Sequence, residues 1–184
     1  MAANADTPMG ARPIRYLGGR PYNGGVTEYI AESASAIFQG DFVKLGGGGA
    51  SVESVDAGDT ILGCMMGAQY TLTDGSYVYS NWKPSATAGV VYIADDPDLI
   101  YLIQAAGALS TANLGGNVDL VVGAGNTTTG RSAMEIANAS ATSSTRQLRI
   151  VDWHRVDDND PTTANALWEV VVNEHHFKTT VGID

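Results

Sequence analysis

Residues 125–132 read GNTTTGRS and differ by one residue from the phosphate-binding pattern G-x-x-x-x-G-K-[ST], with Arg131 in place of the lysine. A loop of this kind binds phosphate because its backbone N–H groups form a nest, its lysine reaches the outer phosphates and a helix follows directly. The planar guanidinium of arginine does not replace a lysine ammonium in so tight a loop, and no helical periodicity follows Ser132. We therefore interpret residues 125–132 as a turn and expect no nucleotide and no other cofactor.

Two acidic segments, ADDPDLIY at 94–101 and DDNDP at 157–161, bring carboxylates close enough for acid–base chemistry or weak cation binding. Asp and Pro are also favoured in turns, and β-prone runs flank the first segment on both sides. Neither segment has the spaced series of oxygen ligands that a calcium site needs. Both are predicted to be surface turns, the first a hairpin turn, without a resident metal.

The histidines and the cysteine form no recognisable catalytic set. His175 and His176 are adjacent, so in an extended segment they face opposite sides and do not favour a shared metal ion. Cys64 lies in TILGCMMG, where a small buried hydrophobic residue is expected. The chain contains no G-x-S-x-G, H-E-x-x-H or Cys/His zinc spacing. We predict no catalytic residues and no enzyme activity.

The candidate binding residues lie near the N-terminus, in ARPIRYLGGRPYNGG at 11–25. Arginine and tyrosine are enriched at protein interfaces. Prolines and glycines predict an extended N-terminal arm over 1–25, followed by a β-rich domain over 26–184. A disordered tail is the alternative, whereas a binding arm becomes ordered on a partner. The candidate contact residues are Arg12, Ile14, Arg15, Tyr16, Arg20 and Tyr22.

The composition restricts the class of partner. The chain has 184 residues, with 20 acidic and 10 basic side chains and a formal net charge of −10. Such a chain repels nucleic acid unless its cations cluster, so no nucleic-acid partner is expected. The sequence has no run of ~18 apolar residues, so no membrane span is predicted. Its first residues lack the apolar core of a signal peptide, so the chain is expected to be made in a cytoplasm. Only 16% of the residues are charged, and a surface poor in long charged side chains suits contacts with neighbouring proteins.

Short β-prone runs predict the fold class. The run at 167–173 alternates as a strand with one buried face does, whereas the run at 99–104 does not alternate and is expected to be covered on both faces, by a second sheet or by a neighbouring subunit. Residues 109–114 are compatible with one helical turn. We predict a single all-β domain, a compact sandwich or barrel with an extended N-terminal arm and little helix. The runs are VTEYI (26–30), DFVKL (41–45), TILGCMMG (60–67), GVVYIA (89–94), LIYLIQ (99–104), VDLVV (118–122), QLRIVDW (147–153) and LWEVVVN (167–173).

Segments over most of the chain resemble head structural proteins of tailed double-stranded DNA phages. They are NADTPMGARPIRYLGGRPYNG, GDFVKL, ILGCMMG, DDPDLIYLIQ, GNVDLVVGAGNTTTGRSAMEI, QLRIVDW and ALWEVVVNEHHF. In size and β-rich character the chain is most similar to the capsid decoration, or cement, proteins of that group. The resemblance implies a structural virion protein on the capsid exterior, without enzyme activity, that clamps adjacent coat subunits. It implies two partners, the major capsid protein and further copies of this chain, with a homotrimer favoured and a homodimer as the alternative.

Two other functions remain open at this point. A head–tail connector or tail protein would share the acidic, β-rich character but occur in few copies per particle. A surface carbohydrate-binding module would use Trp82, Trp153 or Trp168 as stacking platforms. Trp168 alternates with valines and is expected in the core, so Trp82, in SNWKPS, is the better exposed candidate.

Overall fold

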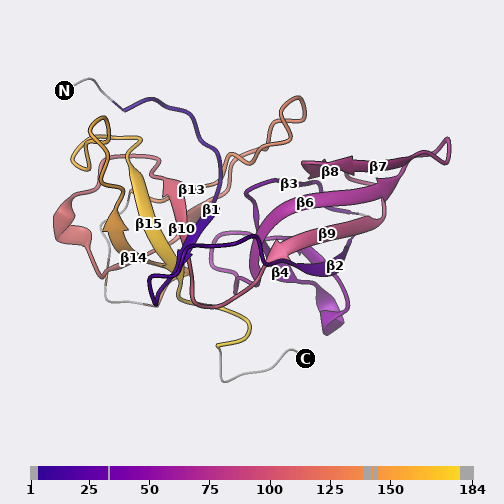
Figure 1. Ribbon diagram of the computed structural model, residues 1–184, viewed down its shortest axis with the longest axis horizontal. Coiled ribbons are helices and arrows are strands. Elements are labelled where there is room, and N and C mark those ends of the chain that lie inside the picture. The colour runs from indigo at the N-terminus through magenta and orange to yellow at the C-terminus, as the bar shows by residue number, and fades with distance from the viewer. Residues whose placement is uncertain (1–3, 33, 139–141, 143–144, 179–184) are drawn as a thin grey trace.

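The computed structural model describes residues 4–32, 34–138, 142 and 145–178. One half of the molecule is a five-stranded sheet in the order β1-β10-β15-β14-β11, with antiparallel pairing throughout (Figure 1). This arrangement brings the first and last strands of the described chain into one sheet. Its strands are β1 (Arg12–Tyr16), β10 (Leu99–Gln104), β11 (Asn117–Val118), β14 (Leu148–Trp153) and β15 (Leu167–Val172).

The other half is a small barrel. Strand β4 pairs with both β5 and β6, and this closes the order β4-β5-β2-β9-β6 into a ring, while β7 pairs with the outer part of β6. Closure leaves few unpaired strand edges, which stabilises a short-stranded sheet. The strands are β2 (Thr27–Ala31), β4 (Phe42–Leu45), β5 (Val52–Ser54), β6 (Gly63–Thr71), β7 (Tyr77–Ser80) and β9 (Gly89–Ala94).

Two strand pairs and two short helical turns complete the fold. Strand β3 (Ile37–Phe38) pairs with β8 (Trp82–Lys83), and β12 (Leu120–Val121) pairs with β13 (Glu135–Ile136). The 3-10 turns are η1 (Gly47–Gly49) and η2 (Thr111–Asn113), and η2 confirms the helical turn predicted at 109–114. The described residues form no α-helix, and none of their helical segments has the length and apolar character needed to cross a bilayer. The all-β prediction is confirmed.

The molecule has two hydrophobic cores, one inside the barrel and a larger one that the five-stranded sheet shares with Phe42 and Ala94 of the barrel strands. The barrel encloses side chains from β2, β4, β5, β6 and β9, among them Val43, Met65 and Ile93. The sheet packs a larger cluster against one face, and Trp168 is fully buried there, as its alternation with valines predicted. Cys64 is buried at the boundary, where its Sγ lies 3.2 Å from the Ala11 carbonyl oxygen, and this confirms its role as a small core residue.

All eight predicted runs contain a strand, with two differences in detail. The run at 118–122 is interrupted at Asp119, so that Val118 belongs to β11 and Leu120 begins β12. The acidic segment after β9 is a turn, but the predicted hairpin is wrong, because β9 lies in the barrel and β10 lies in the five-stranded sheet. Residues 95–98 therefore carry the chain from one half of the molecule to the other.

Strand β10 is buried along its whole length by its own chain, without a neighbouring subunit. Leu99, Tyr101 and Ile103 point into the large core. Ile100 lies opposite Arg15 of β1 and opposite Val171 of β15, so side chains of the two flanking strands share its other face. The expected burial of β10 is confirmed, but side chains of the same sheet line its outer face, where a second sheet or a neighbouring subunit was expected.

The N-terminal segment is extended, but it is not the free arm that its composition predicted. Strand β1 pairs with β10 from Arg12↔Leu102 to Tyr16↔Leu99. The chain then turns back at residues 17–20, and Tyr22 N donates to the Ile14 carbonyl at 3.0 Å. Because an unpaired edge beside a buried strand leaves backbone donors and acceptors unsatisfied, pairing within the chain is favoured over a free arm.

Candidate interaction surface

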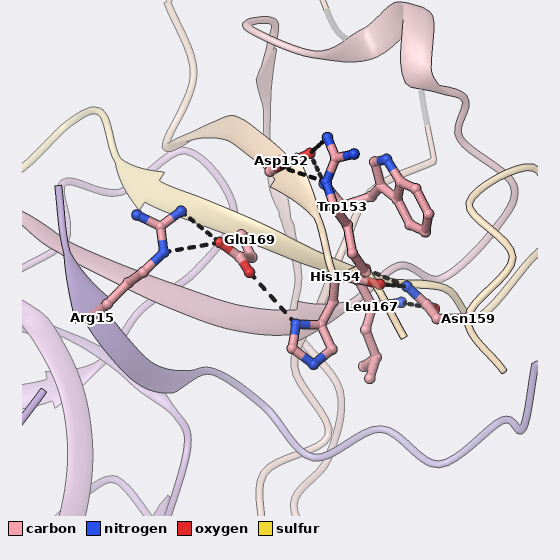
Figure 2. Close-up of polar contacts among 8 residues, drawn as sticks. Arg15, Asp152, Trp153, His154, Asn159, Leu167 and Glu169 are labelled. Carbon is pink, nitrogen blue, oxygen red and sulfur yellow. Dashed lines mark hydrogen bonds and ion pairs between the residues drawn. The ribbon is translucent and has the colours of Figure 1, made fainter. Parts of the chain in front are cut away.

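Arg15, predicted to contact a partner, is bound within the chain. Its Nη2 donates to Oε2 of Glu169 at 2.7 Å and its Nε donates to the same oxygen at 3.2 Å (Figure 2). The other carboxylate oxygen of Glu169 lies 3.5 Å from Nδ1 of His154. Because β10 lies between β1 and β15, this ion pair spans β10 diagonally, from the register position of Ile100 to that of Leu102. Arg15 therefore holds the edge strand in place.

The neighbouring candidates also serve the chain's own structure. Tyr16 and Tyr22 are half-buried and pack against the large core. The guanidinium of Arg20 lies 4.8 Å from the centroid of the Tyr16 ring, and the Tyr22 hydroxyl donates to the Gly25 carbonyl at 2.9 Å. Burial raises the pKa of Tyr22. These contacts stabilise the turn that closes the edge of β1.

Arg12 differs from the other candidates. It is exposed at the start of β1, and its guanidinium has no acceptor among the described residues. Ile14 is half-buried and lies at an irregularity in the register between β1 and β10. Of the six predicted contact residues, Arg12 is the charged side chain that stays available for a partner.

The most exposed aromatic surface lies elsewhere, on the outer face of the barrel. Strand partners Tyr79↔Gln69, Gln69↔Val90 and Val90↔Ile30 place one row of side chains across β7, β6, β9 and β2. Tyr79 is 72% exposed, Ile30 63% and Tyr77 57%. We call this surface the tyrosine face and define it as Tyr77, Tyr79, Tyr92, Ile30, Val90 and Gln69.

The side chains of the tyrosine face are held in position by one another. The Tyr77 and Tyr79 rings meet edge to face with their centroids 5.4 Å apart, and the Tyr92 hydroxyl donates to Oε1 of Gln69 at 2.6 Å. Partial desolvation, followed by the nearby Glu28 carboxylate, raises the pKa of Tyr92, which keeps its hydroxyl protonated. The face therefore presents neutral aromatic and aliphatic groups, with the exposed carboxylate of Glu28 beside Tyr92 at its edge.

Sequence reasoning missed the tyrosine face. The signal was present in the alternation of YVYS at 77–80, but this run is four residues long and follows a turn. The run at 26–30 predicted a strand that contains Ile30, but it did not predict that the Ile30 side chain points to solvent. The strand neighbours that bring Tyr79 and Ile30 into one row are far apart in the sequence, and alternation alone does not identify them.

The loop at 125–132 is a turn, as interpreted from its sequence. Asn126 N donates to the Arg131 carbonyl at 2.8 Å, and Oδ1 of Asn126 accepts from the backbone N–H groups of Thr128 and Thr129. An extended segment leads from Ser132 into β13, where a phosphate-binding loop would continue as a helix. The helix start that phosphate binding requires is therefore not formed, and two of the loop's N–H groups are already bonded to Asn126.

The acidic segments are turns in which several polar side chains bond to their own chain. Asp95 accepts from the Tyr29 hydroxyl at 2.7 Å, and Asp98 pairs with Lys178 at 2.7 Å. In the second segment the Asn159 side chain is buried and bonds backbone groups of His154 and Leu167 (Figure 2). Within the described part of the chain, no three His, Cys, Asp or Glu side chains are grouped to hold a metal.

The adjacent histidines have separate environments. His175 is fully buried, and this burial lowers its pKa to about 4. Its Nδ1 accepts from Phe177 N at 3.1 Å, so the neutral ring acts as a buried acceptor. Nε2 of His176 faces the backbone N–H of Leu45 at 3.3 Å.

Trp168, one of the three tryptophans considered as sugar platforms, is fully buried, and the other two are engaged by their own chain. The Trp82 ring stacks parallel to Phe38 with centroids 5.4 Å apart, and Trp82 is half-buried. Trp153 packs against the large core, and the Arg155 guanidinium lies 5.3 Å from its ring centroid. One face of each ring is thus already covered.

Comparison with known proteins gives no relative: no family model, no curated protein and no solved structure matches this chain.

Proposed function

We propose that this protein is a non-enzymatic structural component of a phage capsid, which binds the outer surface of the shell and bridges neighbouring coat subunits. The tyrosine face carries the proposal. Tyr79, Tyr77 and Ile30 expose aromatic and aliphatic surface on one face of the sheet, on a chain whose net charge is −10. Exposed apolar surface of this kind is typical of a protein-binding site.

The geometry of the tyrosine face favours a protein partner over a small ligand. It lies across four hydrogen-bonded strands, so its residues are displayed on a rigid sheet. A rigid sheet loses little conformational entropy on binding. Tyrosine adds a large contact area at a small entropic cost, which is why it recurs among the residues that dominate binding energy.

The proposed partners are the major capsid protein and further copies of the chain. A homotrimer, with a homodimer as the alternative, presents several tyrosine faces at once, and simultaneous binding multiplies a modest single contact. Arg12 remains a candidate for coat contact. The other predicted contact residues secure the edge of the five-stranded sheet within the chain, namely Arg15, Tyr16, Arg20 and Tyr22.

The copy number in purified particles tests the proposal. Gel densitometry of purified virions is expected to find this chain in amounts comparable to the coat protein. Its absence from intact heads would overturn the proposal. A few copies per particle would replace decoration by a head–tail or tail function.

Binding to particles that lack the chain tests the tyrosine face itself. The variant Tyr79→Ser is expected to bind such shells at least about tenfold more weakly than wild type, which is the size of effect typical of a dominant interface residue. Phe177→Ser is the matched control, because Phe177 is a 57% exposed aromatic residue outside the face. Equal losses for the two variants would contradict a specific role for the face.

A further inference from the structure

Two arginines differ from the other cationic side chains of this chain in having no partner among the described residues. Of the ten lysines and arginines, eight contact a carboxylate, a carbonyl or amide oxygen, or an aromatic ring. Among the described residues, the guanidiniums of Arg12 and Arg131 have no such contact. In a chain with twice as many acidic as basic side chains, two cations without an acceptor require an explanation.

Arg12 and Arg131 line the same pocket. Its volume is about 380 Å³, and Met9, Pro13, Met66 and Gln39 form other parts of its wall. This volume lies within the range of about 300–1,000 Å³ that small-ligand sites occupy. The pocket opens where the N-terminal segment passes from the sheet to the barrel, and junctions between structural units are common places for ligand sites.

The pocket is built on fixed backbone. Arg12 belongs to β1, and its backbone pairs with Leu102. Arg131 forms a β-bridge with Gln39, and Ser132 N donates to the Gln39 carbonyl at 2.9 Å. The Gln39 side chain donates through Nε2 to the Met66 carbonyl at 3.2 Å. The backbone of the two arginines is therefore fixed before any ligand arrives, so binding orders only their exposed side chains.

We propose that this pocket binds a carboxylate carried on a short apolar body. The planar fork of a guanidinium matches a carboxylate, and the hydrogen bonds formed are charge-assisted. Methionine and proline in the wall suit an apolar group next to that carboxylate. The net charge of −10 opposes an extended polyanion such as nucleic acid. The carboxylate comes either from an acidic side chain of a protein partner or from a free small organic acid, and the inference does not depend on the proposed capsid function.

Calorimetric titration with three matched probes tests the ligand class. 4-Methylpentanoate supplies the carboxylate on an apolar body, 4-methylpentanamide is its neutral control, and inorganic phosphate is the competing anion. The carboxylate is expected to bind with a dissociation constant of about 1 mM or lower and to shift the backbone amide resonances of Gln39 and Gly40. Equal binding of the neutral amide, or tighter binding of phosphate, would overturn the proposal.

The blocked peptide acetyl-Ala-Glu-Leu-amide distinguishes the two possible sources of the carboxylate, a protein side chain and a free organic acid. Binding of the peptide indicates a protein side chain, whereas binding of 4-methylpentanoate alone indicates a free acid. If neither binds, the proposal fails.

A double variant tests the two arginines. Arg12→Gln with Arg131→Gln is expected to weaken binding of the carboxylate at least tenfold. Arg149→Gln with Arg155→Gln removes the same charge from exposed arginines outside the pocket and is expected to leave the affinity unchanged. Equal affinity in the two double variants would also overturn the proposal.

Discussion

The main chain of Gly10 crosses the main chain of Gly40 at contact distance. A Cβ on Gly10 would lie 2.5 Å from the Gly40 carbonyl oxygen, and a Cβ on Gly40 would lie 2.6 Å from the Met9 carbonyl oxygen. Both glycines have positive φ, and Ala11 N donates to the Gly40 carbonyl at 2.8 Å. This crossing attaches the N-terminal segment to the barrel and forms part of the wall of the Arg12–Arg131 pocket.

The variant Gly40→Ala is expected to lose about 3 kcal/mol of unfolding free energy, because strained φ and a backbone clash add together. Gly58→Ala is the matched control. Gly58 has φ +92°, close to the +94° of Gly40, but its added Cβ would meet no atom within 4 Å. The control is expected to lose about 1 kcal/mol. Urea denaturation of both variants checks the difference, and equal losses would show that the crossing is not tight.

The ion pair between Arg15 and Glu169 is expected to contribute about 1 kcal/mol to stability, because the Glu169 side chain is largely buried and the pair is partly shielded from solvent. A double-mutant cycle with Arg15→Gln and Glu169→Gln measures this coupling by chemical denaturation. The exposed pair of Arg155 and Asp152 is the control, with an expected coupling below about 0.5 kcal/mol. A larger coupling for the exposed pair would contradict the expectation.

Asp41→Asn is expected to change the pH dependence of stability. Burial raises the pKa of Asp41 from 3.8 to about 6 in the folded protein. Between these values the folded protein holds a proton that the unfolded chain has released, so stability increases as the pH falls from about 6 to about 4. The asparagine does not titrate. Relative to the variant, wild type therefore gains about 3 kcal/mol on acidification from pH 7 to pH 4, as measured by urea denaturation, and a constant difference would refute this.

His175→Gln is expected to have the opposite effect. The pKa of His175 is lowered by burial from 6.5 to about 4, so between these values the unfolded chain binds a proton that the folded protein excludes. Stability from this group is complete above pH 6.5 and is lost as the pH falls toward 4. Relative to the variant, wild type loses about 3 kcal/mol over this range. Thermal unfolding in buffers of stepped pH checks the direction, and a gain in wild-type stability would contradict it.

The two titrations oppose each other in the wild type. Asp41 stabilises the fold on acidification, and His175 destabilises it over nearly the same range. The two single variants are therefore expected to change the pH dependence of stability in opposite directions.

Alternation and turn chemistry predicted much of the fold. The alternating run that contains Trp168 and the unbroken run at 99–104 both became strands with the expected burial. Strand β1 was missed because proline and glycine suggested an arm, yet Pro13 is tolerated in β1 because β1 lies at the edge of its sheet, opposite Tyr101. Barrel closure through Phe42↔Cys64 joins strands whose pairing no local pattern encodes.

Among the candidate sites, too, features determined by neighbouring residues could be predicted from the sequence, whereas features formed by distant residues could not. The turn at 125–132 could be predicted because Asn126 and the glycines determine its conformation locally. The pocket could not, because Arg12 and Arg131 lie more than a hundred positions apart and meet through the Gly10–Gly40 crossing. The arginines and tyrosines at 11–25 led to the prediction of Arg12 as a contact residue, which stays a prediction, but they did not indicate that Arg15 and Tyr16 are used within the chain.

The placement of β1 beside β10 has a consequence for biosynthesis. The barrel uses strands from an uninterrupted stretch, residues 27–94, so it can form as soon as that stretch leaves the ribosome. The sheet draws β1 from the beginning of the chain and β15 from residues 167–172, and such distant contacts form slowly. Residues 12–16 are therefore synthesised long before the sheet can be completed. We expect the barrel to bury its core on the nascent chain before the five-stranded sheet forms.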